Sequence, residues 1–197
     1  MKKTTFILLG IAGVLLTGCL VTSVCPFYTE KDSAFEPALL GNWSKVQQAD
    51  EHWKFAKDGS AYLLSYTPTD GKTSVMETHL FRLKGETFLD LFATDKMEGI
   101  QPPPVPSHFL LRVLQITPTV KLAPLNYDWL KEVLANDSKA LRHHIVKTGD
   151  RSEDRRIVIT ADTPELQQFV IKHLKTEAAW QGAFELERDL SAGSAIK

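Results

Sequence analysis

The chain has 197 residues, of which 43% are hydrophobic, 24% charged and 9% aromatic. These fractions match folded globular domains, which excludes a disordered, collagen-like or coiled-coil chain, and the length favours one domain. Lys plus Arg number 23 and Asp plus Glu number 24, so the formal net charge is -1. A nucleic-acid-binding protein carries a basic excess or a basic stripe. Neither is present, so we expect no nucleic-acid partner.

Residues 1–18 have the pattern of a secretory signal peptide. Lys2 and Lys3 precede an uncharged, mostly apolar run from Phe6 to Leu16. The next residues complete Leu16-Thr17-Gly18-Cys19, which resembles the lipobox of bacterial lipoproteins. The resemblance implies cleavage after Gly18 and acylation of Cys19, which anchors the chain in a membrane stably when several acyl chains are attached. The alternative is an uncleaved membrane span, because no charge occurs between Lys3 and Glu30.

The lipobox resemblance also implies a location. In Gram-negative bacteria, Asp after the lipidated cysteine retains a lipoprotein in the inner membrane, whereas position 20 is Leu here. The expected location is therefore the outer membrane, facing the periplasm. Residues 19–37 show no apolar periodicity and are predicted to form a lipidated tether. Once Cys19 carries lipid, Cys25 has no intramolecular partner and is expected to be a free thiol, with a second acylation or an intermolecular disulfide as the alternatives.

The globular domain is predicted to span residues 38–197. Between Trp43 and Leu125, short apolar runs alternate with turn residues at a spacing typical of an antiparallel meander. One predicted strand contains Trp53 and Phe55, and the others are Ala61–Tyr66, Val75–Leu83, Thr87–Phe92, His108–Ile116 and Thr119–Leu122.

The C-terminal half changes to helical periodicity. One predicted helix places Trp129, Leu130, Val133 and Leu134 on a single face. After a strand at Arg156–Thr160, Thr163 is the predicted N-cap of a second helix, with Pro164 at its first position. The fold class is therefore α+β and mainly β: a meander or small β-barrel with two helices in the C-terminal half.

Gly41-Asn42-Trp43, at the start of the meander, resembles the Gly-x-Trp motif of lipocalins and related calycins. In that family the Trp closes one end of a ligand-binding barrel and a late Arg packs over it, and Arg188 is the candidate for this Arg here. The chain departs from the family because it has no Thr-Asp-Tyr motif and because a helix precedes the last strand.

The barrel interior is the candidate ligand site. Tyr62, Leu64 and Tyr66 share one face of their strand, and Phe88 and Phe92 share one face of theirs with Asp90. We expect the first five to line the interior. Considered by itself, the position of Asp90 between Leu89 and Leu91 favours an outward carboxylate, a buried carboxylate being the alternative. On the next strand, either Phe109, Leu111 and Val113 or the opposite set with Arg112 points inward. An open cavity would bind an apolar ligand and a filled one would be a plain core; both stay open.

No catalytic motif is present. The chain lacks a nucleophile elbow, a phosphate-binding loop, a cysteine pair and a helical zinc motif among its six histidines, and His143 and His144 are expected at the surface. We therefore predict no enzyme activity, no metal and no cofactor. The expected function is a lipid-anchored carrier of a small apolar ligand. The first alternative is an interaction module that binds an envelope protein through its surface or through the Gln101–Pro106 loop. The second is an enzyme without a recognisable motif.

Overall fold

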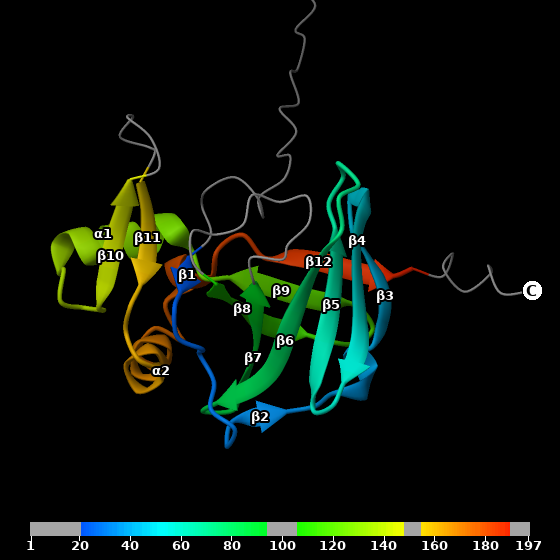
Figure 1. The fold of residues 1–197 in the computed structure, drawn as a ribbon, viewed down its shortest axis with the longest axis horizontal. Coiled ribbons are helices and arrows are strands. Elements are labelled where there is room, and N and C mark those ends of the chain that lie inside the picture. Colours follow the sequence, from blue (N-terminus) through cyan, green and yellow to red (C-terminus); the bar gives the residue numbers. More distant parts are fainter. Residues whose placement is uncertain (1–20, 94–105, 148–154, 190–197) are drawn as a thin grey trace, which may run out of the picture.

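The computed structural model describes residues 21–93, 106–147 and 155–189, which form twelve strands, two α-helices and two short 3-10 helices (Figure 1). Eight of the strands close into an antiparallel barrel, which confirms the predicted fold class. The barrel strands are β3 (Gly41–Lys45), β4 (Gln48–Asp58), β5 (Ala61–Thr67), β6 (Ser74–Leu83), β7 (Glu86–Ala93), β8 (Ser107–Gln115), β9 (Val120–Pro124) and β12 (Phe184–Arg188). Each pairs with its neighbour in the sequence, except that β12 inserts between β3 and β9.

Three further strands extend the sheet beyond the first half of β8. They are β1 (Thr22–Ser23), β11 (Arg155–Ile159) and β10 (His143–Lys147). β1 runs antiparallel to β8 and parallel to β11, and β11 pairs with β10 as a hairpin. The short strand β2 (Ser33–Ala34) pairs with β6. The helices α1 (Tyr127–Asn136) and α2 (Thr163–Lys172) lie on the same side of the barrel as this extension, as Figure 1 shows.

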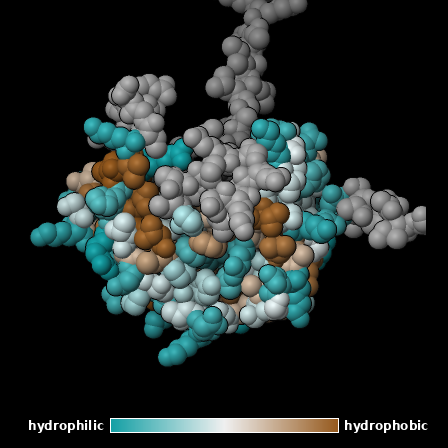
Figure 2. All heavy atoms as spheres, viewed as in Figure 1, coloured by the Kyte–Doolittle hydropathy of each residue, from teal (hydrophilic) through white to brown (hydrophobic). Residues whose placement is uncertain are grey.

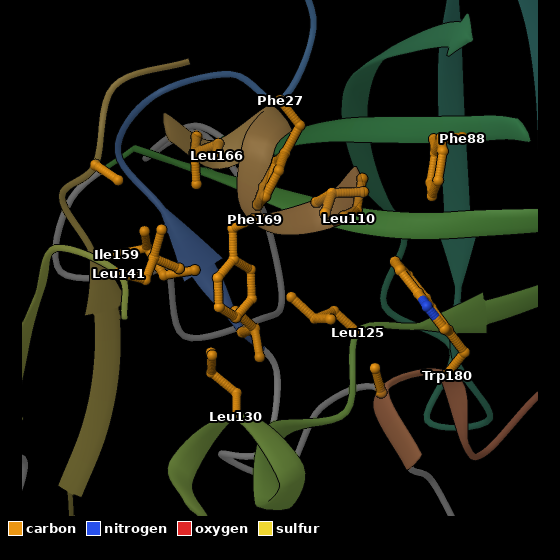
Figure 3. Packing of buried hydrophobic residues seen from close by; sticks show 14 of the residues in the cluster. Phe27, Phe88, Leu110, Leu125, Leu130, Leu141, Ile159, Leu166, Phe169 and Trp180 are labelled. Atoms are coloured by element: carbon orange, nitrogen blue, oxygen red, sulfur yellow. The ribbon is translucent and has the colours of Figure 1, made fainter. Parts of the chain in front are cut away.

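The sheet separates two hydrophobic cores. The inner core lies inside the barrel and includes Trp43, Trp53, Phe55, Tyr62, Leu64, Tyr66, Met76, Leu89, Leu91, Leu111, Val113, Leu122 and Leu186. The outer core lies between the outside of β6–β8 and the helices (Figure 3). It includes Val21, Phe27, Phe81, Phe88, Leu110, Leu125, Leu130, Leu141, Ile159, Leu166, Phe169 and Trp180.

The predicted tether at 19–37 is wrong for the part that the structure describes, residues 21–37. Val21 is 3% exposed and Phe27 1% exposed, and both belong to the outer core. β1 and β2 hold this segment on the barrel, and the 3-10 helix η1 (Pro37–Leu39) follows directly. Two-residue strands carry too few residues to show a periodicity, which explains why the pattern resembles a linker. The domain therefore starts by residue 21.

Both helices bury the faces that the sequence predicts. Leu130 and Leu134 of α1 are buried, and Trp129 and Val133 pack against the same core. In α2 the N-cap is Asp162 and not Thr163, because the Asp162 carboxylate accepts the backbone N–H of Glu165 at 3.0 Å. The Thr163 hydroxyl donates instead to the carbonyl of Pro26 at 2.7 Å, which ties α2 to the N-terminal segment. Across the described ranges, no helix has the length and apolar character needed to cross a membrane.

Candidate functional site

Three of the five predicted ligand-site residues face the barrel interior. Tyr62, Leu64 and Tyr66 belong to the inner core, and Leu111 and Val113 join them, so the first of the two predicted sets on β8 points inward. The aromatic rings along this wall touch one another. The ring centroids of Trp53 and Tyr66 are 5.0 Å apart, and those of Trp53 and Phe184 are 5.6 Å apart.

The other two predicted residues, Phe88 and Phe92, face away from the interior. Phe88 packs in the outer core against Phe81 and Trp180. Phe92 lies on the same outer face and stacks on His108 with ring centroids 4.5 Å apart. The two phenylalanines do share a face, as expected, but residues on both faces of β7 are buried. Alternation then shows which residues lie together without showing which set enters the barrel.

One end of the barrel is closed by the segment that precedes β3. Leu39 is buried, and its carbonyl accepts the indole N–H of Trp43 at 2.9 Å. The guanidinium of Arg188 lies 4.1 Å from the centre of the Trp43 ring, which is the contact that the Gly-x-Trp resemblance implies. The same guanidinium donates to the carbonyls of Leu40 and Ala38 at 2.7 and 2.8 Å.

Gly41 makes this closure possible. Its φ of +122° lies in a region that residues with a side chain rarely adopt, and a Cβ there would collide with the Arg188 guanidinium. On the same end, Phe35 stacks on Tyr62 at 4.8 Å, and the Tyr62 hydroxyl accepts the backbone N–H of Glu36 at 2.7 Å. The Tyr62 ring is therefore held by the closing segment.

Glu51 brings a charge into the inner face of β4, near the β3–β4 turn. It is 3% exposed, and its carboxylate accepts from Lys45 Nζ and from the Trp53 indole N–H, both at 3.2 Å. Burial raises the pKa of Tyr66 above its ordinary value, and the carboxylates of Glu51 and Asp70 raise it further. A buried carboxylate is costly unless it is paired. Glu51 is paired on both oxygens, so this end of the interior is polar and ordered.

Thr78 is a second polar residue of the interior. It lies on β6 in register with Tyr62 of β5 and Leu91 of β7, and its side chain is fully buried. Its hydroxyl makes no hydrogen bond within the described part of the chain. Most buried polar groups in folded proteins are satisfied, so an isolated hydroxyl inside an apolar barrel requires an explanation.

Asp90 points out of the barrel, as expected, but it is buried, because the N-terminal segment covers it. Its carboxylate accepts the backbone N–H of Phe27 at 2.8 Å and lies 2.6 Å from Nδ1 of His108. A buried carboxylate that orients a histidine ring is the arrangement used by many general bases. Here the same carboxylate fastens the N-terminal segment to β7, so we assign Asp90 a structural role.

Tyr28 lies beside this pair and stacks on His79, with ring centroids 4.2 Å apart. Burial, together with the nearby carboxylates of Asp90, Glu77 and Glu30, raises the pKa of Tyr28 to about 12. The outer face of β6–β8 is thus covered by residues 27 and 28.

The cysteines, the proline-rich loop and the paired histidines are the remaining candidates from the sequence. Cys19 lies outside the described residues, as does the Gln101–Pro106 loop apart from Pro106. Cys25 is a free thiol, half-buried against the outer core. His143 is half-buried on β10 and His144 is exposed. Within the described ranges, no three His, Cys, Asp or Glu side chains are grouped so that they could hold a metal ion.

The chain was also compared with known proteins. No family model matches it, and neither the curated proteins nor the solved structures give a significant match.

Proposed function

We propose that this protein is a lipid-anchored protein of the bacterial cell envelope whose barrel binds a small, largely apolar ligand. The signal pattern and the lipobox support acylation of Cys19, and Leu20 supports the outer membrane, facing the periplasm. Binding without catalysis is proposed because the chain carries no recognisable nucleophile motif.

The observation that carries the binding proposal is the Thr78 hydroxyl. It is fully buried in an apolar interior and has no partner in the described chain. A polar atom of a ligand would satisfy this hydroxyl, while the aromatic and aliphatic wall around it would bury the ligand's apolar part. Because Trp43 and Arg188 close one end of the barrel, the proposal requires the ligand to enter at the end where Glu51 and Lys45 lie.

A direct test is native mass spectrometry with lipid extraction on the Cys19→Ala chain purified from bacteria. A co-purifying apolar molecule is expected. Leu64→Phe should abolish its binding, because Leu64 is fully buried in the inner core and the larger ring takes up interior volume. Leu63→Phe is the matched control, because Leu63 is adjacent but 39% exposed and points outward. Near-ultraviolet circular dichroism would verify that both variants fold.

If neither a co-purifying molecule nor binding of a fluorescent fatty-acid probe is detected, the interaction-module alternative replaces this proposal. The outer face then supplies the contact surface, and Leu63 and Val75 on adjacent β5 and β6 are exposed apolar residues on it. The anchor has its own test: Cys19→Ala should abolish labelling by a clickable fatty acid. Labelling that persists excludes Cys19 as the acylated residue.

A further inference from the structure

Within the described ranges, β10 is the outermost strand of the sheet extension and is paired on one side only. The barrel closes on itself because β9 pairs with both β8 and β12, and β1 and β11 are each paired on both sides. β10 pairs with β11 alone, and Figure 1 shows it at the margin of the extension. A free strand edge presents unpaired backbone groups that can bind another strand.

Hydrogen bonds of the neighbouring strand show which residues of β10 face this free edge. The Arg142 carbonyl accepts the backbone N–H of Thr160 at 2.9 Å, so these two residues form a hydrogen-bonded pair of the antiparallel ladder. Such pairs recur at every second residue, so the even-numbered residues of β10 bond to β11. The carbonyl of Ile159 accepts the N–H of Val24 at 3.0 Å instead, which agrees with this alternation. Three residues of β10 therefore direct their N–H and C=O groups to the free edge: His143, Ile145 and Lys147.

We propose that this edge pairs with the same edge of a second copy of the chain, antiparallel and centred on Ile145. A two-fold axis there places Ile145 opposite Ile145, and His143 opposite Lys147. All three outward residues then bond to outward residues, whereas an axis at residue 144 or 146 pairs only two of them. The two-fold contact also closes after two copies and builds no filament. This inference depends neither on the proposed anchor nor on the proposed ligand.

The side chains of β10 suit this register. Ile145 is 54% exposed, the highest value among the exposed large hydrophobic residues of the described chain, and the axis brings it against its own mate. The surface of the molecule has a group of apolar residues over β10 and β11 (Figure 2). Lys147 is the only Lys, Arg, Asp or Glu of β10. Like charges directly opposite each other destabilise a strand pair, and the register places Lys147 opposite an imidazole and not opposite a second Lys147.

The edge is also regular and uncovered. Natural edge strands are protected by prolines, bulges, inward-pointing charges or a covering element. β10 contains no proline and pairs with β11 without a register shift. Among the described strands of five or more residues, it alone has no buried residue. Two five-residue strands form a contact well below the roughly 1,200 Å² of a standard interface, so we expect a weak dimer that depends on concentration.

Disulfide cross-linking tests the register in the full chain with Cys19→Ala and Cys25→Ser, where the introduced thiol is the only one. Ile145→Cys places two thiols opposite each other across the axis. The Cα atoms of such a hydrogen-bonded pair lie about 5.5 Å apart, within the range of a disulfide. Lys147→Cys is the matched control on the same edge, because its two copies are offset by four residues, about 13 Å. A cross-linked dimer is expected from the first variant and none from the second.

A mixture of His143→Cys and Lys147→Cys chains should give the mixed dimer, because the register pairs these two positions. Equal cross-linking of Ile145→Cys and Lys147→Cys overturns the proposal, since it would mean random collision. Absence of cross-linking in a folded Ile145→Cys chain also overturns it, and leaves the edge for an extended segment of another protein. Near-ultraviolet circular dichroism verifies the fold of each variant.

A second measurement examines the same contact without a thiol. Ile145→Lys places two lysines opposite each other across the axis, so the concentration-dependent dimer of the Cys19→Ala chain should be lost in sedimentation velocity. Leu114→Lys is the matched control, because Leu114 is similarly exposed (50%) but lies near the end of β8, and it should leave the dimer intact. A parent chain that stays monomeric at the highest concentration reached, or a dimer that survives Ile145→Lys, overturns the proposal.

Discussion

The inner and outer cores share the strands β6–β8 but are assembled in different ways. The inner core comes almost entirely from successive hairpins, in which each strand pairs with the next. The outer core joins residues from both ends of the chain, from Val21 to Trp180. Its parts contact the barrel only after long loops have closed. The barrel is therefore the local part of the fold, and the N-terminal segment and the helices are its long-range part.

Each side of the sheet buries one side-chain polar atom that has no hydrogen-bond partner among the described residues: the Thr78 hydroxyl in the barrel and Nε of Arg112 on the outer face. The Arg112 guanidinium is nevertheless held by its other two nitrogens, which donate to the Leu174 carbonyl and to the Glu86 carboxylate, both at 2.9 Å. In the outer core region, the Asp90 carboxylate is bound both by a backbone N–H and by His108. In the barrel, Thr78 has no partner among the described residues. The comparison predicts that the outer core serves stability and that the inner core gives up some stability for binding.

The largest expected effect is on the outer core. Phe27→Ala should lower the free energy of unfolding by about 3–5 kcal/mol, because it removes a fully buried ring and leaves a cavity. Chemical denaturation of the Cys19→Ala chain measures it. Val24→Ala is the control, since Val24 lies in the same segment but is 39% exposed and should change stability little. Equal small losses for both variants would mean that the segment is only loosely attached.

The next effect concerns the closed end of the barrel. Gly41→Ala should cost about 1–3 kcal/mol, because the new Cβ strains a positive φ and displaces Arg188 from Trp43. Gly59→Ala is the matched control: its φ is also positive, but a Cβ there meets nothing within 4 Å.

The double variant Gly41→Ala, Arg188→Ala separates the two causes at Gly41. If the collision with Arg188 dominates, the second substitution restores part of the loss, and thermal denaturation would show it. A purely additive double variant would assign the whole cost to the backbone at Gly41.

The sequence predicted the local part of the fold well and the long-range part poorly. Strand alternation and turn spacing predicted β5 to β8, and helical periodicity predicted the buried face of α1. The Gly-x-Trp resemblance made Arg188 a candidate for the contact with Trp43, and the two side chains do pack together. These signals depend on neighbouring residues or on a motif, so they are visible in one sequence.

The failures have a common physical origin. Residues 21–34 are held by two-residue strands and by Phe27, and neither leaves a periodic signal. The outer core covers the outer face of β7, so Phe88 on that face and Leu89 on the inner face are equally buried. Hydrophobicity therefore did not distinguish the two faces, and Phe88 was assigned to the interior wrongly. The burial of Asp90 on the outer face was not the favoured expectation, because its partners, Phe27 and His108, are distant in sequence. The sequence could not single out Thr78, because the lack of a partner for its hydroxyl arises only in the folded barrel.

The third prediction concerns the inner core. Thr78→Val keeps the shape of the side chain and removes the unpartnered hydroxyl, so the ligand-free chain should gain about 1 kcal/mol of stability. The affinity for the co-purifying ligand should fall about fivefold, the cost of one hydrogen bond. Denaturation and ligand titration measure the two effects. Thr73→Val is the control: its hydroxyl, exposed in a turn, is bonded to Thr67. A loss of stability in Thr78→Val would show that the hydroxyl is already satisfied.

The smallest expected effect is a dependence on pH in the outer core. His173 caps the end of α2 and packs between Trp129 and Phe169, with ring centroids 4.8 and 4.7 Å away. Burial, and to a lesser extent the charge of Lys172, lowers the pKa of His173 below its ordinary 6.5. The unfolded chain therefore takes up a proton at a higher pH than the folded chain does. The stability that the neutral ring contributes is present above pH 6.5 and is lost as the pH falls below it.

Replacing His173 by Gln removes this titration, so the fall in denaturation midpoint below pH 6.5 should become shallower. His144→Gln, on the exposed side of β10, is the matched control for the loss of an imidazole. A profile that is as steep in His173→Gln as in the parent chain would assign the acid sensitivity to other groups. In that case His173 would be only a packing residue between the two helices.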